Sequence, residues 1–319
     1  PAFGNLVPRD VASRAAKERC DKGFGVNNTG LAVFLDFSEA INRLGKDVVA
    51  QRYGNLFDMY EEITDVSPYE NPMMIYPAIH YTMGGIWVDY ELMTSIKGLF
   101  AIGECNFSDH GANRLGASAL MQGLADGYFV LPYTIQNYLA DQITVPRFST
   151  DLPEFAAAEK AVQEKIDWMM NIKGKKSVDS IHKELGHIMW EYVGMGRTAE
   201  GLKEGLKKLK EVRKEFEKEL FIPGDKEGMN VELDKAIRLY DFITMGELVA
   251  YDALNRNESC GGHFREEYQT EEGEAKRDDE NYFYVACWEY QGSDEKEPVL
   301  LKEPLVYEAI KVQTRNYKS

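Results

Sequence analysis

The chain has 319 residues, of which 44% are hydrophobic and 28% charged, a composition that is ordinary for a globular protein with a sizeable core. No run of about 18 consecutive apolar residues occurs, so the sequence predicts no membrane-spanning helix. The net charge of −16, from 37 basic and 53 acidic residues, opposes a phosphate-neutralising surface, and we do not expect nucleic acid as a partner. The first residue is Pro1 and no signal peptide follows it, so we expect the start to lie inside a longer chain.

The first 65 residues alternate between helical and extended patterns. Asp10 and Ser38 can each accept hydrogen bonds from the free N–H groups at the start of a helix. We therefore expect helices over residues 11–20, 39–44 and 46–60, and a strand over residues 30–37. Prolines at positions 68, 72 and 77 then indicate a linker.

Residues 78–132 are expected to be rich in strands and to end in a glycine-rich loop and a helix. Residues 98–104 (G-L-F-A-I-G-E) have the pattern of a short buried strand with a carboxylate, Glu104, at its end. The loop at residues 109–118 follows, and a run of small residues then predicts a helix over residues 119–130.

Residues 153–257 are predicted to be helical almost throughout. Glu204 precedes Lys208 by four residues, a spacing at which the two side chains form a supporting ion pair on a helix. Large apolar residues recur at helical spacing in the same stretch, at Leu202, Leu206, Leu209 and Phe216. From residue 258 onward the sequence becomes polar, rich in aromatic residues and mixed in pattern.

One candidate site combines the carboxylate of Glu104 with the loop and helix after it. An acidic residue at the end of such a strand commonly accepts hydrogen bonds from a ribose or ribityl hydroxyl. Ala119 and Leu120 open a helix whose N–H groups favour the partial negative charge of a reduced flavin. Arg114, in the loop, can hold a carboxylate through two parallel hydrogen bonds. Spacing alone favours a plainer interpretation, a glycine-rich turn whose arginine pairs with a nearby acid.

Two further patches contain residues suited to binding an anion. His80 lies just before Gly84 and Gly85 and can donate a hydrogen bond to a substrate carboxylate, although a histidine beside a turn is more often structural. Arg9 precedes a helix cap and is, taken alone, an ordinary surface arginine. No metal-ligand set emerges from the remaining histidines, at positions 182, 187 and 263.

In this order, the three patches resemble signature segments of the succinate dehydrogenase/fumarate reductase flavoprotein family. The family segments P-R-D-x-x-x-R, H-Y-x-M-G-G, G-L-[FY]-A-x-G-E and H-G-A-N-R-L-G are similar to residues 8–14, 80–85, 98–104 and 110–116. The resemblance covers essentially the whole chain and continues to residues 258–265 and 277–281. There the family's S-R-G-x-H has Cys260 in place of arginine, and an acidic stretch at residues 270–276 looks like an insertion.

The resemblance implies a multidomain fold of mixed α+β and α/β type. It implies the end of a substrate-closing cap domain at residues 1–74 and the C-terminal part of the FAD-binding domain at residues 75–133. A helical domain at residues 134–258 and a small C-terminal domain at residues 259–319 follow. No G-x-G-x-x-G is present, so the family's pyrophosphate-binding finger and its flavin-attaching histidine are expected upstream of this chain.

The same resemblance implies the chemistry. Succinate and fumarate would be interconverted by hydride transfer to or from FAD, with Arg9 as the proton shuttle. His80 and Arg114 would bind the substrate carboxylates, and Glu104, Ala119 and Leu120 would hold the flavin. The implied partners are an iron–sulfur subunit and membrane anchor subunits, which would place the protein peripherally on the cytoplasmic side of the membrane.

Two alternatives remain open at this stage. An L-aspartate oxidase shares the first three patches, but residues 302–307 and 315–317 resemble the tail of the complex II flavoprotein, which that enzyme lacks. The second alternative is a fragment without activity of its own, because the residues expected upstream are needed to bind the cofactor.

Overall fold

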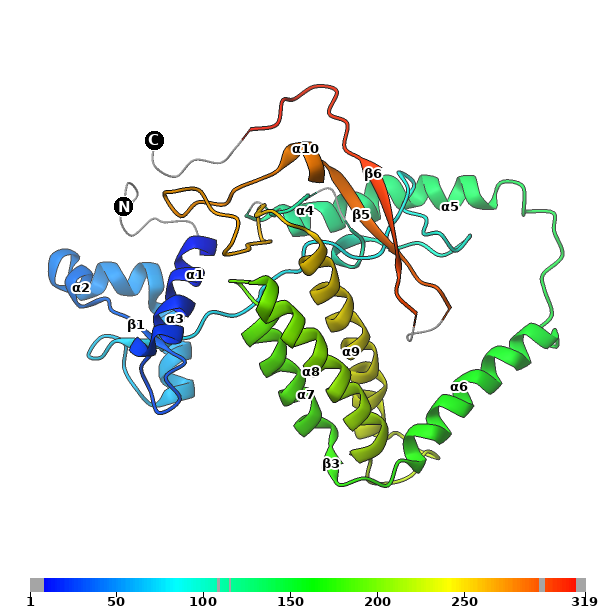
Figure 1. The fold of residues 1–319 in the computed structure, drawn as a ribbon, viewed down its shortest axis with the longest axis horizontal. Coiled ribbons are helices and arrows are strands. Elements are labelled where there is room, and N and C mark those ends of the chain that lie inside the picture. Colours follow the sequence, from blue (N-terminus) through cyan, green and yellow to red (C-terminus); the bar gives the residue numbers. More distant parts are fainter. Residues whose placement is uncertain (1–8, 108–109, 115, 293–295, 314–319) are drawn as a thin grey trace. The chain divides into compact units, whose positions relative to one another are not determined.

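A computed structural model describes residues 9–107, 110–114, 116–292 and 296–313. It divides the chain into two compact units, a smaller one of residues 1–80 and 312–319 and a larger one of residues 81–311. Figure 1 shows the elements of both. Residue 8 of the first motif, residue 115 of the motif at 110–116 and the whole tail segment at 315–317 lie outside the described residues.

The smaller unit packs two long helices beside a two-stranded sheet. Phe57 is fully buried at its centre, with Phe37 and Tyr69 edge-on to its ring at centroid distances of 5.0 and 4.8 Å. The elements are α1 (Arg9–Arg19), a π-helical turn (Cys20–Phe24), β1 (Val33–Leu35), α2 (Ser38–Leu44), α3 (Lys46–Thr64) and β2 (Met73–Ile75), with β1 and β2 antiparallel.

The predicted helices of this unit form, but both predicted caps are wrong. Asp10 lies within the first turn of α1, where its carboxylate is 3.5 Å from Arg14, so it is part of the helix. Ser38 is the first residue of α2, and its N–H donates to the Oδ1 atom of Asp36 at 2.8 Å. The strand predicted over residues 30–37 shortens to β1, because only three residues find partners on β2.

The helical prediction for residues 153–257 is confirmed. Leu202, Leu209 and Phe216 are fully buried, and Glu204 lies 3.8 Å from Lys208. Side chains of Ser177, Thr198 and Asn230 cap the helices that begin after them. This bundle consists of α6 (Pro153–Asn171), α7 (Val178–Ile188), a π-helical turn (Met189–Val193), α8 (Ala199–Glu219) and α9 (Val231–Asn255), with a short parallel pair, β3 (Lys176–Ser177) and β4 (Leu220–Phe221).

The strand-rich structure predicted for residues 78–132 is wrong. Residues 98–104 pair with their neighbours at one isolated bridge, Met93 to Phe100, and Gly103–Cys105 forms a 3₁₀ turn. A strand needs a partner along its length, and here the described chain offers residues 98–104 only a short partner, residues 92–94, through bonds from Thr94 N–H to Leu99 and from Ala101 N–H to Leu92. The helical part of the prediction holds, as α4 (Ser118–Ala125), a π-helical turn (Asp126–Val130) and α5 (Leu131–Leu139).

The C-terminal region is a hairpin anchored to the bundle. The hairpin pairs β5 (Tyr284–Glu289) with β6 (Val299–Pro304) in antiparallel register and follows the short helix α10 (Asp279–Tyr282). The indole N–H of Trp288 donates to Asp252 of α9 at 2.7 Å. The described residues thus combine helices with small sheets, as the predicted mixed class requires, while the four-domain division stays a prediction. No helix in the described ranges is both long and apolar enough to cross a bilayer.

Candidate functional site

Two of the sequence motifs lie side by side in the larger unit. The N–H of Ile86 donates to the carbonyl of Cys105 at 2.9 Å, and the N–H of Phe107 returns a bond to the carbonyl of Ile86 at 2.9 Å. Gly85 has φ +153°, and a Cβ there would lie 2.5 Å from the carbonyl oxygen of Cys105. The second glycine of the H-Y-x-M-G-G motif is therefore required by the close approach of the two backbones.

Glu104 lies on this junction with its side chain exposed to solvent. One carboxylate oxygen accepts the backbone N–H of Thr82 at 3.2 Å, which orients the group toward the H-Y-x-M-G-G segment. An ionised carboxylate has about four lone-pair positions, so this bond leaves acceptor capacity for the hydroxyl of a ligand.

A buried polar network, which the sequence reasoning missed, lies behind Glu104. Oδ2 of Asp126 accepts the backbone N–H of Gly103 at 3.1 Å and the side-chain amide of Gln122 at 3.3 Å. Gln122 also donates to Asn106 at 3.1 Å, and these three side chains are at most 9% exposed. The network ties the turn of Glu104 to α4. The spacing of Gln122 and Asp126, four residues apart in an otherwise apolar helix, was the available signal.

The start of α4 faces outward without a polar cap. Ala117, the N-cap residue, has φ 63° in the left-handed region and no side-chain oxygen with which to accept the free N–H groups. Ala119 is half-buried, and Leu120 is 78% exposed. The N–H groups of a helix start are donors with partial positive charge, so this position suits a ligand atom with partial negative charge.

Arg114 is held by aromatic side chains. Its guanidinium carbon lies 4.7 Å from the centre of the Tyr81 ring, and His110 meets that ring edge-on at 5.6 Å. The Nε atom of Arg114 is buried and has no hydrogen-bond partner within the described residues. The plainer interpretation, an arginine paired with a nearby acid, finds no support among those residues. A buried N–H without a hydrogen-bond partner is costly, and an oxyanion that accepts from Nε would relieve that cost.

Arg9 and His80 belong to the smaller unit. Arg9 begins α1 and is exposed, and His80 is exposed at the end of the segment that follows β2. The structure describes the two units separately, so it brings Glu104, Arg114, Ala119 and Leu120 into one unit without testing the roles of Arg9 and His80.

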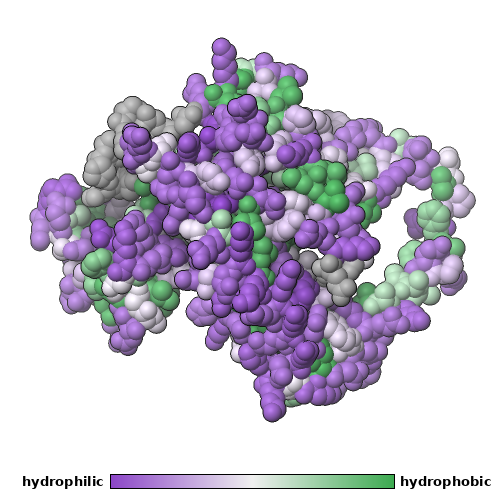
Figure 2. Space-filling view, in the orientation of Figure 1, coloured by the Kyte–Doolittle hydropathy of each residue, from purple (hydrophilic) through white to green (hydrophobic). Residues whose placement is uncertain are grey.

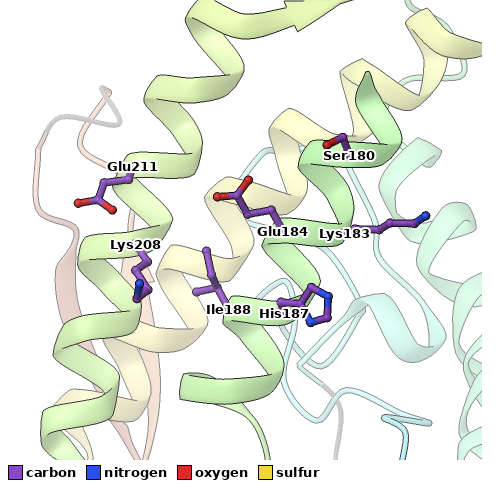
Figure 3. A pocket seen from close by; sticks show the side chains of 7 residues that line it. All are labelled: Ser180, Lys183, Glu184, His187, Ile188, Lys208 and Glu211. Carbon is purple, nitrogen blue, oxygen red and sulfur yellow. The ribbon is translucent and has the colours of Figure 1, made fainter. Parts of the chain in front are cut away.

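A groove of about 360 Å³ lies elsewhere, between α7 and α8 (Figure 3). Lys183 and Lys208 contribute positive charge, and Glu184 and Glu211 contribute negative charge. None of the predicted site residues lines this groove. Its mixed, solvent-facing charges are typical of the outer surface of a helical pair.

Comparison with known proteins decides the family. The family model for the fumarate reductase flavoprotein C-terminus matches residues 182–317, and the model for an FAD binding domain matches residues 3–120. The chain belongs to the succinate dehydrogenase/fumarate reductase flavoprotein family. The predicted cofactor, FAD, is confirmed by the second of these models, and the relatives that the chain matches are named as dehydrogenases and reductases.

The chain spans a little under half the length of the curated relatives it matches. It is 34% identical over 269 residues to the succinate dehydrogenase flavoprotein subunit of Bacillus subtilis, covering 84% of this chain and 44% of the relative. It is 32% identical over 286 residues to the fumarate reductase flavoprotein subunit of Escherichia coli, covering 88% and 44%. A solved E. coli quinol fumarate reductase variant superposes with a TM-score of 0.81 at 27% identity, covering 96% of this chain and 50% of the other.

The residues present fit one side of a flavin. Glu104 offers an exposed acceptor, and the start of α4 offers donors, with the buried Asp126 network fixing the two relative to each other. The oxygen of the Gln122 side-chain amide is buried without a hydrogen-bond partner in the described chain, so the network itself has spare acceptor capacity beneath this surface. The G-x-G-x-x-G motif that usually holds a pyrophosphate group does not occur in this sequence.

Proposed function

We propose that this chain is the C-terminal part of a flavoprotein subunit that interconverts succinate and fumarate and passes electrons to an iron–sulfur subunit. The observation that carries this proposal is Arg114. Its guanidinium lies on the ring of Tyr81 with a buried Nε atom that lacks a partner among the described residues. It occurs in the same unit as Glu104 and the open start of α4.

Arg114 binds one carboxylate of the dicarboxylate substrate. Stacking on Tyr81 restricts the guanidinium plane, which reduces the side-chain entropy lost when two parallel hydrogen bonds form. His80 donates a hydrogen bond to the other carboxylate. With both carboxylates held, the carbon–carbon bond between them is oriented for reaction.

Glu104, Ala119 and Leu120 hold one side of FAD. Bound FAD supplies the group that accepts or returns the hydride. Glu104 would accept a hydrogen bond from a cofactor hydroxyl, and the N–H groups of Ala119 and Leu120 would donate to a part of the cofactor with partial negative charge. Stronger hydrogen bonds to the reduced form favour reduction.

Arg9 moves the proton that accompanies the hydride. A guanidinium holds its proton very tightly in water, so removal of a proton from succinate by Arg9 requires a desolvated site that disfavours the charged form. Exclusion of water from the substrate-bound site would supply this condition. In the direction of fumarate reduction Arg9 acts as an acid, which is its ordinary state.

The partners proposed for the complete protein are an iron–sulfur subunit and membrane anchor subunits. The names of the relatives support this assignment, since the solved neighbours include quinol fumarate reductases. Attachment through such partners would place the subunit peripherally on the cytoplasmic side of the membrane.

The test is Arg114→Ala in the complete subunit, with Arg147→Ala, an exposed arginine of the same unit, as the control. Loss of a buried charge-assisted contact costs about 2–5 kcal/mol, so the dissociation constants of succinate, fumarate and malonate should rise together by roughly 30-fold or more. Arg147→Ala should leave them unchanged. Equal dicarboxylate affinity in Arg114→Ala and the parent would defeat the assignment, and oxidation of L-aspartate as fast as that of succinate would favour an aspartate oxidase.

A further inference from the structure

The loop that carries Arg114 is contacted by a tight turn about 150 residues further along the chain. We call residues 110–114 the arginine loop and residues 260–263 the glycine turn. The glycine turn is closed by reciprocal backbone bonds between Cys260 and His263, at 2.8 and 3.0 Å. From its tip, the N–H of Gly262 donates to the carbonyl of Ala112, in the middle of the arginine loop, at 2.7 Å.

The contact between turn and loop leaves no room for a side chain. A Cβ at Gly261, where φ is +58°, would lie 2.3 Å from the carbonyl oxygen of Ala112. A Cβ at Gly262 would lie 2.5 Å from the terminal methyl of Met83, in the H-Y-x-M-G-G segment. The glycine turn therefore packs against both of the motif segments that form the candidate site.

The other side of the glycine turn is fixed to the helical bundle. Nη1 of Arg197, just before α8, lies 2.7 Å from Nδ1 of His263, and Nε2 of His263 lies 3.0 Å from the carbonyl of Arg256. A guanidinium can only donate, so Nδ1 is the acceptor and Nε2 carries the proton that it donates to Arg256. Burial, followed by the charge of Arg197, lowers the pKa of His263 to about 4, which keeps the ring in this neutral form near neutral pH.

We propose that the glycine turn is a positioning element of the dicarboxylate site, which fixes the arginine loop so that Arg114 is held at its carboxylate. The inference rests on the proposed function of Arg114 and adds Gly261 and Gly262 to the residues that determine substrate affinity. The arginine loop contains small residues and little regular structure, and its middle carbonyl is held by Gly262. Displacements of about 1 Å in such a site change binding and rate strongly.

The chain offers a matched pair of variants for the test. Gly261→Ala and Gly273→Ala both place a side chain at a left-handed backbone position, with φ +58° and +80°. The strain is therefore similar, but the nearest atom at Gly273 is 3.8 Å away and belongs to Gln269, outside the site. Only Gly261→Ala pushes on the arginine loop.

The measurement is malonate affinity, flavin content and melting temperature of the complete, flavin-loaded subunit. Gly261→Ala should raise the malonate dissociation constant by about tenfold relative to Gly273→Ala, at the same flavin content. A malonate affinity equal to that of Gly273→Ala would overturn the inference. Arg114→Ala, measured in parallel, separates the two ideas. If Arg114→Ala leaves malonate affinity unchanged, the proposed function fails; if it weakens binding while Gly261→Ala does not, only the positioning role fails.

Gly262→Ala decides the question if Gly261→Ala does not yield a flavin-containing subunit. Its new methyl group meets the flexible end of Met83, which can move, so the fold should survive. We then expect a malonate dissociation constant raised by about threefold at an unchanged melting temperature. An unchanged dissociation constant in this variant would overturn the inference.

Discussion

The helical bundle buries many more apolar side chains than the segment that carries the candidate site. Among the residues that the structure describes, the bundle core contains 19 buried apolar residues between Met169 and Ala253, whereas the cluster of Val88, Leu92 and Ala101 contains three. Large side chains along α4 and α5 remain exposed, with Leu120 at 78% and Tyr133 at 68%. In the view of Figure 2, the surface of α7 and α8 is mainly hydrophilic.

The bundle can fold by itself more readily than the segment that carries the candidate site. The bundle buries its apolar face with partners that are close in sequence, which makes its stability local. The helices α4 and α5 present an apolar surface of the kind that marks an interaction site. The site segment thus requires further covering surface, while the bundle does not.

The largest expected effect is a difference between two leucine truncations in the isolated chain. Leu209 is fully buried in α8, and Leu124 is 56% exposed in α4. Leu209→Ala should lower the free energy of unfolding of the bundle by about 2–5 kcal/mol because it leaves a cavity. Leu124→Ala should change it by less than about 0.5 kcal/mol. Chemical denaturation followed by circular dichroism gives both values. An equal loss of unfolding free energy in the two variants would show that α4 is packed as well as the bundle.

The buried network behind Glu104 gives the next effect. Asp126→Ala removes the acceptor of the Gly103 N–H and of the Gln122 amide, leaving buried donors unpaired at a cost of about 1–3 kcal/mol. In the complete subunit this should loosen the turn of Glu104 and weaken FAD binding, measured by flavin retention during dialysis. Asp126→Asn keeps an oxygen for Gly103 and should retain more flavin. Full retention in Asp126→Ala would remove the network from cofactor binding.

The smallest expected effect is a loss of folding stability at low pH that is caused by protonation of His263. Its pKa is lowered to about 4 by burial and by Arg197, Arg256 and Arg265, so the unfolded state binds a proton at higher pH than the folded state. The stabilisation is present above the ordinary histidine pKa of about 6.5 and is lost as pH falls toward 4. The loss should amount to about 1–3 kcal/mol.

Thermal melting of the parent and of His263→Gln checks this dependence. The parent should lose more stability than His263→Gln between about pH 7.5 and about pH 4.5, because glutamine does not titrate in that range. Parallel pH profiles for the two proteins would show that His263 does not contribute.

The sequence predicted the bundle well and the site segment poorly for the same physical reason. Apolar residues at helical spacing, such as Leu202 and Leu209, lie on one face of a helix, so the periodicity of the sequence alone predicts that they are buried together. Residues 98–104 have an equally clear apolar run, but a strand also needs a partner that the run does not specify. The motif residues Glu104 and Arg114 were found through resemblance, whereas the contact from Gly262 to Ala112 joins positions too distant for any local pattern.

The most direct test of the account is whether the 319-residue chain alone retains flavin. The chain should be mixed with excess FAD, passed through gel filtration and examined by absorbance and circular dichroism. We expect a helical protein without a flavin band, because Glu104 and the start of α4 contact one side of the cofactor, and the elements that must be ordered cost about 1–2 kcal/mol per residue. A yellow protein whose flavin absorbance co-elutes with the chain would contradict the account.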